Sequence, residues 1–279
     1  MAKFSFYRST PPIALLTDFG FKDNYVGVMK GVIRKICPDA DVIDLSHNIM
    51  PQDVTEAAFV LSSAYRYFPE GTIFVNVVDP GVGSERSILC LKANGQFFLA
   101  PDNGLLSVIS NETEREALHE VTNREHFLED VSGTFHGRDI FAPVAAHLAA
   151  GVDIEEIGPA LDHMKRLQLP RPVRTAEGKL RGKIVYVDHF GNLITNISEN
   201  MIRTAFNCPL DAIEVTVKRQ KVRGIRRSYS DADEGDLVVL IGSTGYLEIA
   251  INGDSAEKAL GAEKGDSVNL STLQAVSEG

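Results

Sequence analysis

Short apolar runs alternate with segments of helical periodicity along the first part of the chain. Runs such as IALLT and TIFVNVV predict buried strands, and apolar positions at helical spacing between such runs predict helices. Asp53 is placed to cap the second of these helices. The predicted order is strand 13–17, helix 25–36, strand 41–45, helix 54–67 and strand 72–78. This alternation predicts an α/β domain with a mostly parallel sheet and right-handed crossovers.

The middle of the chain carries a hairpin signal, one more helix and then a loss of periodicity. SILCLKA and QFFLA, separated by an Asn-Gly pair, predict a hairpin. A helix is expected over 138–150, before a glycine. The stretch 161–178 contains two prolines and little periodicity, so we place the domain boundary there. The expected domains are 1–165 and 166–279.

Beyond this boundary the hydrophobic pattern changes. Short β-branched runs are divided by Gly, Asn and Asp, and helical periodicity is almost absent. The runs are KIVYV, LITNI, AIEVTV, LVVLI, YLEIAI and SVNL. This pattern is typical of a smaller all-β domain, either a barrel or a sandwich.

Composition narrows the class of protein. The 279 residues are 44% hydrophobic and 24% charged, with a formal net charge of -10, which favours a folded protein without the basic face that nucleic-acid binding needs. No apolar stretch approaches the length of a membrane span, so we expect no membrane partner. Cys37, Cys90 and Cys208 lie far apart without a C-x-x-C spacing, which favours reduced thiols in a cytoplasmic protein.

Two aspartates follow predicted parallel strands. Asp18 comes after the first strand and Asp79 after the third. In an open α/β sheet, ligands bind beyond the carboxyl ends of the strands, so both side chains would reach one crevice if these strands are neighbours. The alternative is that each aspartate stabilises a turn.

Other polar residues accompany these aspartates. Arg86 lies seven residues after Asp79, beyond a glycine-rich turn, and His136 stands between two glycines just before the helix at 138–150. His47 is a weaker candidate of the same kind. No His, Asp or Cys cluster has metal-site spacing, so we expect no metal.

Two glycine-rich corners of the second domain carry Asn, Ser and aromatic residues. DHFGNLITN and IGSTGYLEIAING could be ordinary β-turns, or they could recognise a nucleoside or a similar planar group. In the second case Phe190 or Tyr229 would stack on the ligand, and Asn192 or Ser243 would hydrogen-bond to it.

The ordered set of motifs resembles one enzyme family over nearly the whole chain. TDFG, DLSH, VNVVDPGVGSERS, APDNG, SGTFHGRDIFAPVAAHLA, DHFGNLITN and IGSTGYLEIA occur in the order seen in the S-adenosylmethionine (SAM) hydroxide adenosyltransferases, which are related to fluorinating and chlorinating enzymes. The resemblance implies an α/β N-terminal domain and a β-barrel-like C-terminal domain. It also implies a homotrimer whose sites lie between the N-domain of one subunit and the C-domain of the next. The implied reaction is hydrolysis of SAM, as substrate and without a cofactor, to adenosine and L-methionine.

The resemblance also implies catalytic residues. Family members that use water carry an Asp, Arg and His set, which falls on Asp79, Arg86 and His136. The halogenating relatives replace these positions and often carry an insertion after the Arg position. Here only a short hairpin separates Arg86 from APDNG, as expected for the branch that uses water. We expect Asp79 mainly to orient the water, because a neighbouring arginine stabilises the charged carboxylate.

Substrate contacts are implied in the same way. Asp18 would hold the ribose hydroxyls, and Asp23 and Asp188 would lie near the methionine amino group. Tyr25, Thr244 and Ile251 stand where the fluorinating relatives have other side chains, so the methionine end differs from theirs. The implied binding set is Asp18, Asp23, Asp188, Phe190, Asn192, Tyr229, Ser243 and Thr244.

Three rival functions are compatible with parts of this pattern. A magnesium-dependent phosphoryl-transfer enzyme could use Asp18 and Asp79 as metal ligands. A non-catalytic nucleoside sensor would keep Asp18 and Asn192 but would need no Asp79–Arg86–His136 set. A SAM-dependent halogenase-like enzyme is the third alternative.

Overall fold

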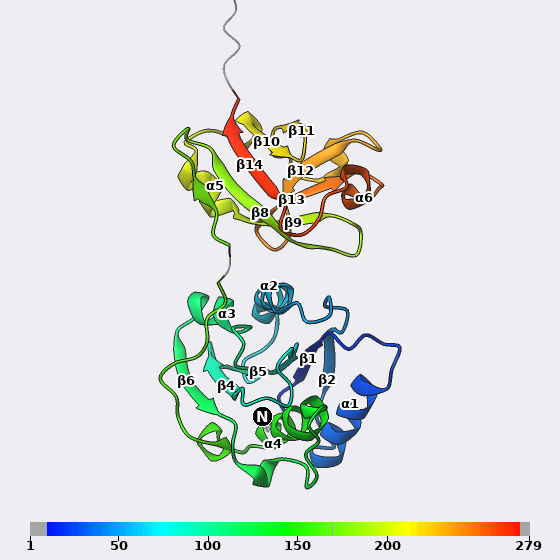
Figure 1. Cartoon of the computed structure of the whole chain (residues 1–279), viewed down its shortest axis with the longest axis vertical. Helices are drawn as coiled ribbons and strands as arrows, with labels where there is room; N and C mark the ends of the chain where they lie inside the picture. The colour runs from blue at the N-terminus through cyan, green and yellow to red at the C-terminus, as the bar shows by residue number, and fades with distance from the viewer. Residues whose placement is uncertain (1–9, 169, 274–279) are drawn as a thin grey trace, which may run out of the picture. The chain divides into compact units, whose positions relative to one another are not determined.

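The chain forms two structural units. A computed structural model describes residues 10–168 and 170–273 (Figure 1). Internal contacts divide the chain between Leu167 and Gln168. The domain limits 1–165 and 166–279 stay a prediction, because a division by contacts does not show that either part folds alone. Within the described ranges, no helix combines the length and apolar character that crossing a membrane requires.

The first unit alternates strands and helices in the predicted order. Its main elements are β1 (Ile13–Thr17), α1 (Tyr25–Ile36), β2 (Val42–Ser46), α2 (Val54–Ala64), β3 (Ile73–Val77), β4 (Ile88–Ala93), β5 (Gln96–Pro101), α3 (Ser107–Glu112), β6 (Arg115–Glu120) and α4 (Ala142–Ala149). The short helical turns are η1 (Tyr65–Tyr67), η2 (Arg124–His126), the π-helical η3 (Gly137–Phe141) and η4 (Ile154–Ile157).

The six strands form one sheet in the order β2-β1-β3-β5-β4-β6. Neighbouring strands from β2 to β5 are parallel, whereas β4 runs antiparallel to both β5 and β6. The prediction of a mostly parallel sheet is confirmed. β1 and β3 pair directly up to Thr17 and Val77, so the residues that follow both strands emerge at the same sheet edge.

Helices cover both faces of this sheet. Successive side chains of β1 point to opposite faces. Ile13 and Leu15 share a core with residues of α1 and α4, while Ala14 and Leu16 share another with residues of α2 and α3. Each fully buried Leu or Ile contributes roughly 1.5–3 kcal/mol relative to exposure. These two cores fix the sheet edge from which the site residues project.

Two predicted helices differ from the observed ones. Asp53 caps α2 as expected, accepting the Glu56 N–H at 2.9 Å, but residues 65–67 form the separate turn η1. The helix predicted over 138–150 begins instead as the π-helical η3 and becomes α-helical only at Ala142. Pro143 has no N–H to donate to Asp139, and the Asp139 carbonyl accepts the Leu128 N–H at 2.9 Å. π-helical turns are frequent at functional sites.

The second unit is built almost entirely of antiparallel strands. Its elements are β7 (Val173–Arg174), β8 (Leu180–Val187), β9 (Leu193–Ser198), α5 (Glu199–Ala205), η5 (Leu210–Ala212), β10 (Ile213–Val217), β11 (Gln220–Arg223), η6 (Tyr229–Asp231), β12 (Leu237–Ile241), β13 (Tyr246–Ile251), α6 (Ala256–Leu260) and β14 (Ser267–Thr272). The sheet order is β11-β10-β14-β8-β9-β13-β12, and β7 pairs with β8.

This second sheet curls into a nearly closed barrel. The Arg226 N–H donates to the Val239 carbonyl at 2.7 Å, which brings the segment after β11 onto β12, the opposite end of the sheet. The predicted barrel-like all-β architecture is confirmed. The short helices α5 and α6 were not predicted, because elements of seven and five residues are too short to show a helical period.

Candidate active site

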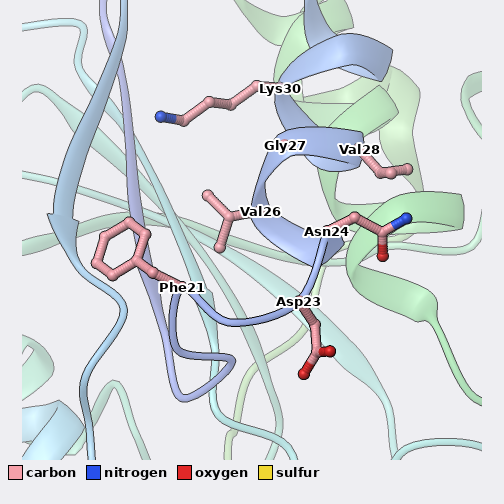
Figure 2. Close-up of a pocket in the computed structure, with 7 residues that line it drawn as sticks. All are labelled: Phe21, Asp23, Asn24, Val26, Gly27, Val28 and Lys30. Atoms are coloured by element: carbon pink, nitrogen blue, oxygen red, sulfur yellow. The ribbon is translucent and has the colours of Figure 1, made fainter.

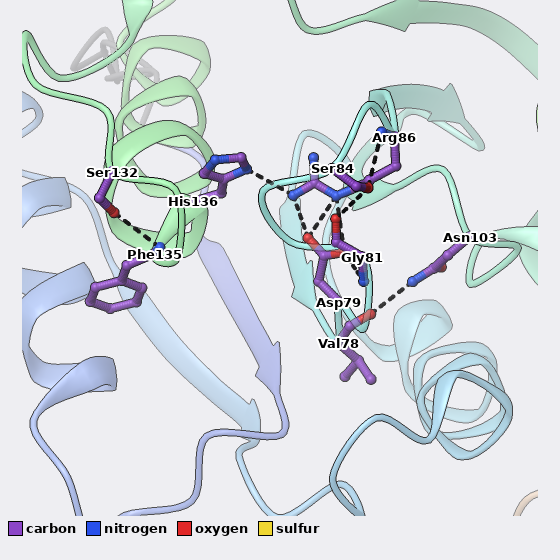
Figure 3. A network of polar contacts seen from close by, with 9 residues as sticks. All are labelled: Val78, Asp79, Gly81, Ser84, Arg86, Asn103, Ser132, Phe135 and His136. Carbon is purple, nitrogen blue, oxygen red and sulfur yellow. Dashed lines mark hydrogen bonds and ion pairs between the residues drawn. The ribbon is translucent and has the colours of Figure 1, made fainter.

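A buried ion pair lies at the end of β3. The Arg86 Nε donates to both carboxylate oxygens of Asp79, at 2.9 and 2.8 Å, and its Nη2 also bonds to Asp79 (Figure 3). The two side chains are only 7% and 4% exposed, respectively. The Gly81 N–H adds a hydrogen bond to Asp79 at 3.2 Å. The turn between β3 and β4 therefore folds back so that its two ends hold each other through charge-assisted bonds.

His136 completes this group from a distant part of the chain. Its Nδ1 lies 2.9 Å from the Arg86 Nη2. A guanidinium can only donate, so Nδ1 accepts and the neutral ring carries its proton on Nε2. Burial, and then the Arg86 cation, lower the pKa of His136, against the opposing carboxylates of Asp79 and Asp139. The ordinary histidine pKa is about 6.5, so His136 is neutral at pH 7.

Close contact between two loops makes this meeting possible. Gly83 has φ +77°, and a Cβ added there would stand 2.3 Å from the Gly133 carbonyl oxygen. A side chain at Gly83 would therefore push apart the loops that carry Arg86 and His136. The left-handed backbone also favours glycine.

Two residues outside the predicted set hold these loops. Asp139, fully buried, accepts the Ser132 N–H at 2.9 Å and its hydroxyl at 2.8 Å. Asn103 donates to the Val78 carbonyl at 2.9 Å, directly before Asp79 (Figure 3). Both stand inside quoted motifs, APDNG and SGTFHGRD, and their presence there was the only sequence signal for them.

Asp18 lies at the same sheet edge, directly after β1. Its Oδ2 accepts the Gln52 N–H at 2.8 Å. Gln52 has φ +66°, a left-handed conformation that is strained for a residue with a side chain. The loop between β2 and α2 is thus bent to hold the Asp18 carboxylate from one side.

Asp23 lines a separate hollow at the start of α1. Figure 2 shows it beside Asn24, the residue that precedes α1, with Phe21 on the preceding loop and Lys30 further along the helix. The hollow has a volume of about 420 Å³.

In the second unit, Asp188 bonds within its own turn. Its Oδ1 accepts the N–H groups of Phe190 and Asn192, both at 2.9 Å, and its Oδ2 accepts from the Asn192 side chain at 2.9 Å. These bonds fit the alternative of a turn-stabilising aspartate.

Three of the predicted recognition residues line one pocket. Phe190, Asn192 and Tyr229 border a pocket of about 620 Å³, together with residues 251–255. Phe190 is 75% exposed. Ser243 and Thr244 lie in the turn between β12 and β13 and do not belong to this lining. The structure therefore gathers the aromatic candidates but not the two hydroxyl candidates.

Glu248, which was not predicted as a site residue, bonds to Tyr229 of this pocket. It is buried, and its Oε1 accepts the Tyr229 hydroxyl at 2.5 Å. Burial, reinforced by the Asp188 charge, raises the pKa of Glu248. Burial and the hydrogen bond to Glu248 raise the pKa of Tyr229. A single acidic residue in the apolar run YLEIAI was the available signal.

The sequence matches two family domains. Residues 13–158 match the SAM hydroxide adenosyltransferase N-terminal domain, and residues 182–269 match the SAM hydroxide adenosyltransferase C-terminal domain. The two matches fall on the two structural units.

Individual relatives match over almost their full length. A protein of Salinispora tropica named (R)-S-adenosyl-L-methionine hydrolase is 38% identical, over 94% of this chain and 98% of its own. One of Thermus thermophilus with the same name is also 38% identical, over 93% and 99%. Fluorinases match at 30–33% identity.

A solved structure shows the same fold. It is described as an uncharacterized conserved protein from Thermotoga maritima, is 40% identical, and superposes with a TM-score of 0.87 over 92% of this chain and 99% of that one. The domain matches and the near full-length relatives lead to one conclusion: this chain belongs to the SAM hydroxide adenosyltransferase family.

Proposed function

We propose that this protein is a hydrolase that converts SAM to adenosine and L-methionine. A water oxygen forms a bond to the ribose C5′ as the C5′–S bond breaks. The electron pair of that bond returns to sulfur, giving the methionine thioether, and one water proton is released. The observation that carries the proposal is the Asp79–Arg86–His136 cluster, in which the Asp79 and Arg86 side chains are buried; the hydrolase names of relatives at 38% identity support it.

The hydrogen-bond directions divide the work among the three residues. His136 accepts from Arg86 at Nδ1, so its Nε2–H, which also meets the Ser132 backbone, is the ring donor that we assign to the water oxygen. Asp79 is the acceptor for a water hydrogen, and Arg86 holds both partners in place. The water is then oriented by one donor and one acceptor, with a lone pair free to attack.

Orientation supplies more of the rate enhancement than proton removal. Positioning a reactant can contribute about 7–11 kcal/mol, whereas a general base typically contributes about 10²- to 10⁴-fold. A carboxylate bound on both oxygens by a guanidinium suits the first role. The sulfonium of SAM is a good leaving group and needs no acid.

The same ion pair argues against the rival functions. An arginine that binds both oxygens of Asp79 competes with the magnesium ion that phosphoryl transfer requires. A nucleoside sensor has no need for an Asp–Arg–His cluster at the end of β3. A halogenase-like enzyme would have to bind halide beside the Asp79 carboxylate, which repels it.

Three finer points belong to the same proposal. The protein needs no separate cofactor, because SAM is the substrate. It works on the R epimer at sulfur, for which its relatives are named. It assembles as a homotrimer with each site between two subunits. One subunit contributes Asp18, Asp23 and the Asp79–Arg86–His136 cluster. The next contributes the pocket bordered by Phe190, Asn192 and Tyr229 (the Phe190 pocket), with Ser243 and Thr244 near the methionine end.

Isotope labelling tests the reaction. The protein is incubated with each SAM epimer in H₂¹⁸O, with EDTA and without, and products are analysed by mass spectrometry. We expect adenosine with one ¹⁸O atom at the 5′ position, unlabelled methionine, a preference for the R epimer and no effect of EDTA. Unchanged SAM would favour the sensor, and adenosine without ¹⁸O would exclude attack by water at C5′.

A further inference from the structure

A buried chain of polar side chains runs beneath the loop that carries Asp18. The hydroxyl of Thr17 lies 2.8 Å from the Nδ1 of His47, and the Nε2 of His47 lies 3.0 Å from the Oδ1 of Asp44. Thr17 and His47 are both 0% exposed. Asp44 is partly exposed and forms an ion pair with Lys30 at 2.7 Å.

The direction of each hydrogen bond follows from the groups involved. The Asp44 carboxylate can only accept, so Nε2 of His47 donates to it; in the tautomer whose single proton is on Nε2, Nδ1 is the acceptor. Thr17 therefore donates its hydroxyl proton to His47, and the Thr17 oxygen accepts the Phe19 N–H at 3.2 Å. Along the chain from Phe19 to Asp44, each group therefore donates a hydrogen bond to the next.

A hydroxyl, an imidazole and a carboxylate in this order resemble a nucleophilic triad. The burial of Thr17 excludes that role, because a nucleophile must reach its substrate and this hydroxyl has no exposed surface. Its oxygen is also engaged by the Phe19 N–H. The chain therefore holds the backbone in place and does not attack a substrate.

His47 holds the Asp18 loop at two further points. Its carbonyl oxygen accepts the Gly20 N–H at 2.8 Å. Its ring meets the edge of Phe21, with 5.1 Å between ring centroids and an interplanar angle of 89°. Thr17 on one side of Asp18 and Gly20 and Phe21 on the other are thus all tied to one histidine.

We propose that His47 is a positioning residue for ribose recognition: by accepting the Thr17 hydroxyl, it fixes the turn that presents the Asp18 carboxylate. The inference rests on the proposed function, in which Asp18 holds the ribose hydroxyls. Arrangement of a binding group within about half an ångström depends on such supporting contacts. The hydrogen bond of His47 to Thr17 holds the turn, and the separate hydrogen bond from the Gln52 N–H holds the Asp18 carboxylate.

Four variants of the full-length protein test the inference. His47→Gln keeps a donor toward Asp44 but loses the acceptor for Thr17, whereas His47→Asn keeps an acceptor near the Nδ1 position. Thr17→Val removes the hydroxyl at nearly constant volume, and Thr17→Ser retains it. For each variant, calorimetry measures the affinities for adenosine and 2′,3′-dideoxyadenosine. Steady-state kinetics with SAM gives kcat and KM, and thermal unfolding gives the melting temperature.

We expect His47→Gln and Thr17→Val to weaken adenosine binding about 3- to 10-fold, as for loss of one buried hydrogen bond. KM should rise with kcat nearly unchanged, because the chemistry is assigned elsewhere. His47→Asn and Thr17→Ser should stay close to wild type, and dideoxyadenosine affinity should not change in any variant.

Two results would overturn the inference alone. The first is wild-type adenosine affinity in both His47→Gln and Thr17→Val. The second is an equal loss in all four variants, which would indicate a fold-maintaining role. If the wild-type protein binds both nucleosides equally, the ribose role of Asp18 fails instead, and this inference fails with it.

Discussion

The two units hold their candidate residues in different ways. In the first unit, Asp79 and Arg86 are 4% and 7% exposed and bond to each other, and Arg86 also bonds to His136. In the second, Phe190 is 75% exposed and, with Tyr229, borders an open pocket. The cluster in the first unit is complete without a ligand, whereas the pocket in the second leaves an aromatic ring in water.

The difference matches the division between the proposed chemistry in the first unit and the proposed substrate recognition in the second. Burying a carboxylate and a guanidinium costs hydration free energy, which their mutual attraction only partly offsets. Such pairs are therefore weak evidence for a contribution to stability. The proposed role in orienting water gives the Asp79–Arg86 pair a function beyond stability. An exposed aromatic ring, by contrast, gains its contacts only when a planar group stacks on it.

The largest expected effect comes from breaking the cluster. Asp79→Ala or His136→Ala should lower kcat at least about 10²-fold, because each removes a partner of the attacking water. Adenosine affinity should change little, since neither side chain is assigned to the nucleoside. Single-turnover kinetics and calorimetry measure the two quantities separately.

A matched pair guards this prediction against a folding artefact. Asp79→Ala leaves Arg86 buried without its partner, so Asp79→Asn, of nearly the same shape, serves as the comparison. Both variants should lose turnover even where their melting temperatures differ. Equal losses in adenosine affinity and in turnover would contradict the assignment to water.

A smaller effect is expected at Asp18, which lies at the same sheet edge and which we propose binds the ribose. Asp18→Asn should weaken adenosine binding by about 1.5–3 kcal/mol, the range for a hydrogen bond to a charged group. Nucleosides without ribose hydroxyls should bind the wild-type protein more weakly by a similar amount, and the Asp18→Asn change should not weaken their binding further. If 2′,3′-dideoxyadenosine bound Asp18→Asn much more weakly than wild type, the ribose role would be wrong.

Patterns local in sequence predicted the fold well. The helix expected over 25–36 is α1 residue for residue, and all three predicted parallel strands are present within one or two residues. β6, with the sequence REALHE, was missed because it is half exposed and lacks an apolar run. The π-helical start at Gly137 was missed because the hydrophobic pattern does not distinguish a π-helical from an α-helical turn. The structural cause is local: Pro143 has no N–H to donate to the Asp139 carbonyl.

The candidate site was predictable as a set of residues but not as a set of contacts. Adjacent parallel strands bring Asp18 and Asp79 to one edge, as the alternating pattern indicated. The bond between Arg86 and His136 spans 50 residues and depends on two glycine-lined loops touching. The role of Glu248 beneath Tyr229 depends on a barrel closing over a charged side chain, which no short motif encodes.

The last prediction links the two units through assembly. If each site combines the Asp79–Arg86–His136 cluster of one subunit with the Phe190 pocket of the next, an Asp79→Ala protein and an Asn192→Ala protein each have only incomplete sites. In a closed ring of head-to-tail contacts, every mixed trimer contains one interface where both halves are intact.

Subunit exchange between these two inactive proteins should therefore restore activity. With random exchange at equal amounts, about a quarter of all interfaces pair an intact cluster with an intact pocket, because each half is intact independently with a chance of about one half. The recovered rate should approach that fraction of the wild-type rate, and mixing either variant with itself is the control. Native mass spectrometry verifies that trimers form and exchange. Verified exchange without recovery would mean that each chain builds its site alone, and the open pocket would then need another explanation for its exposed Phe190 ring.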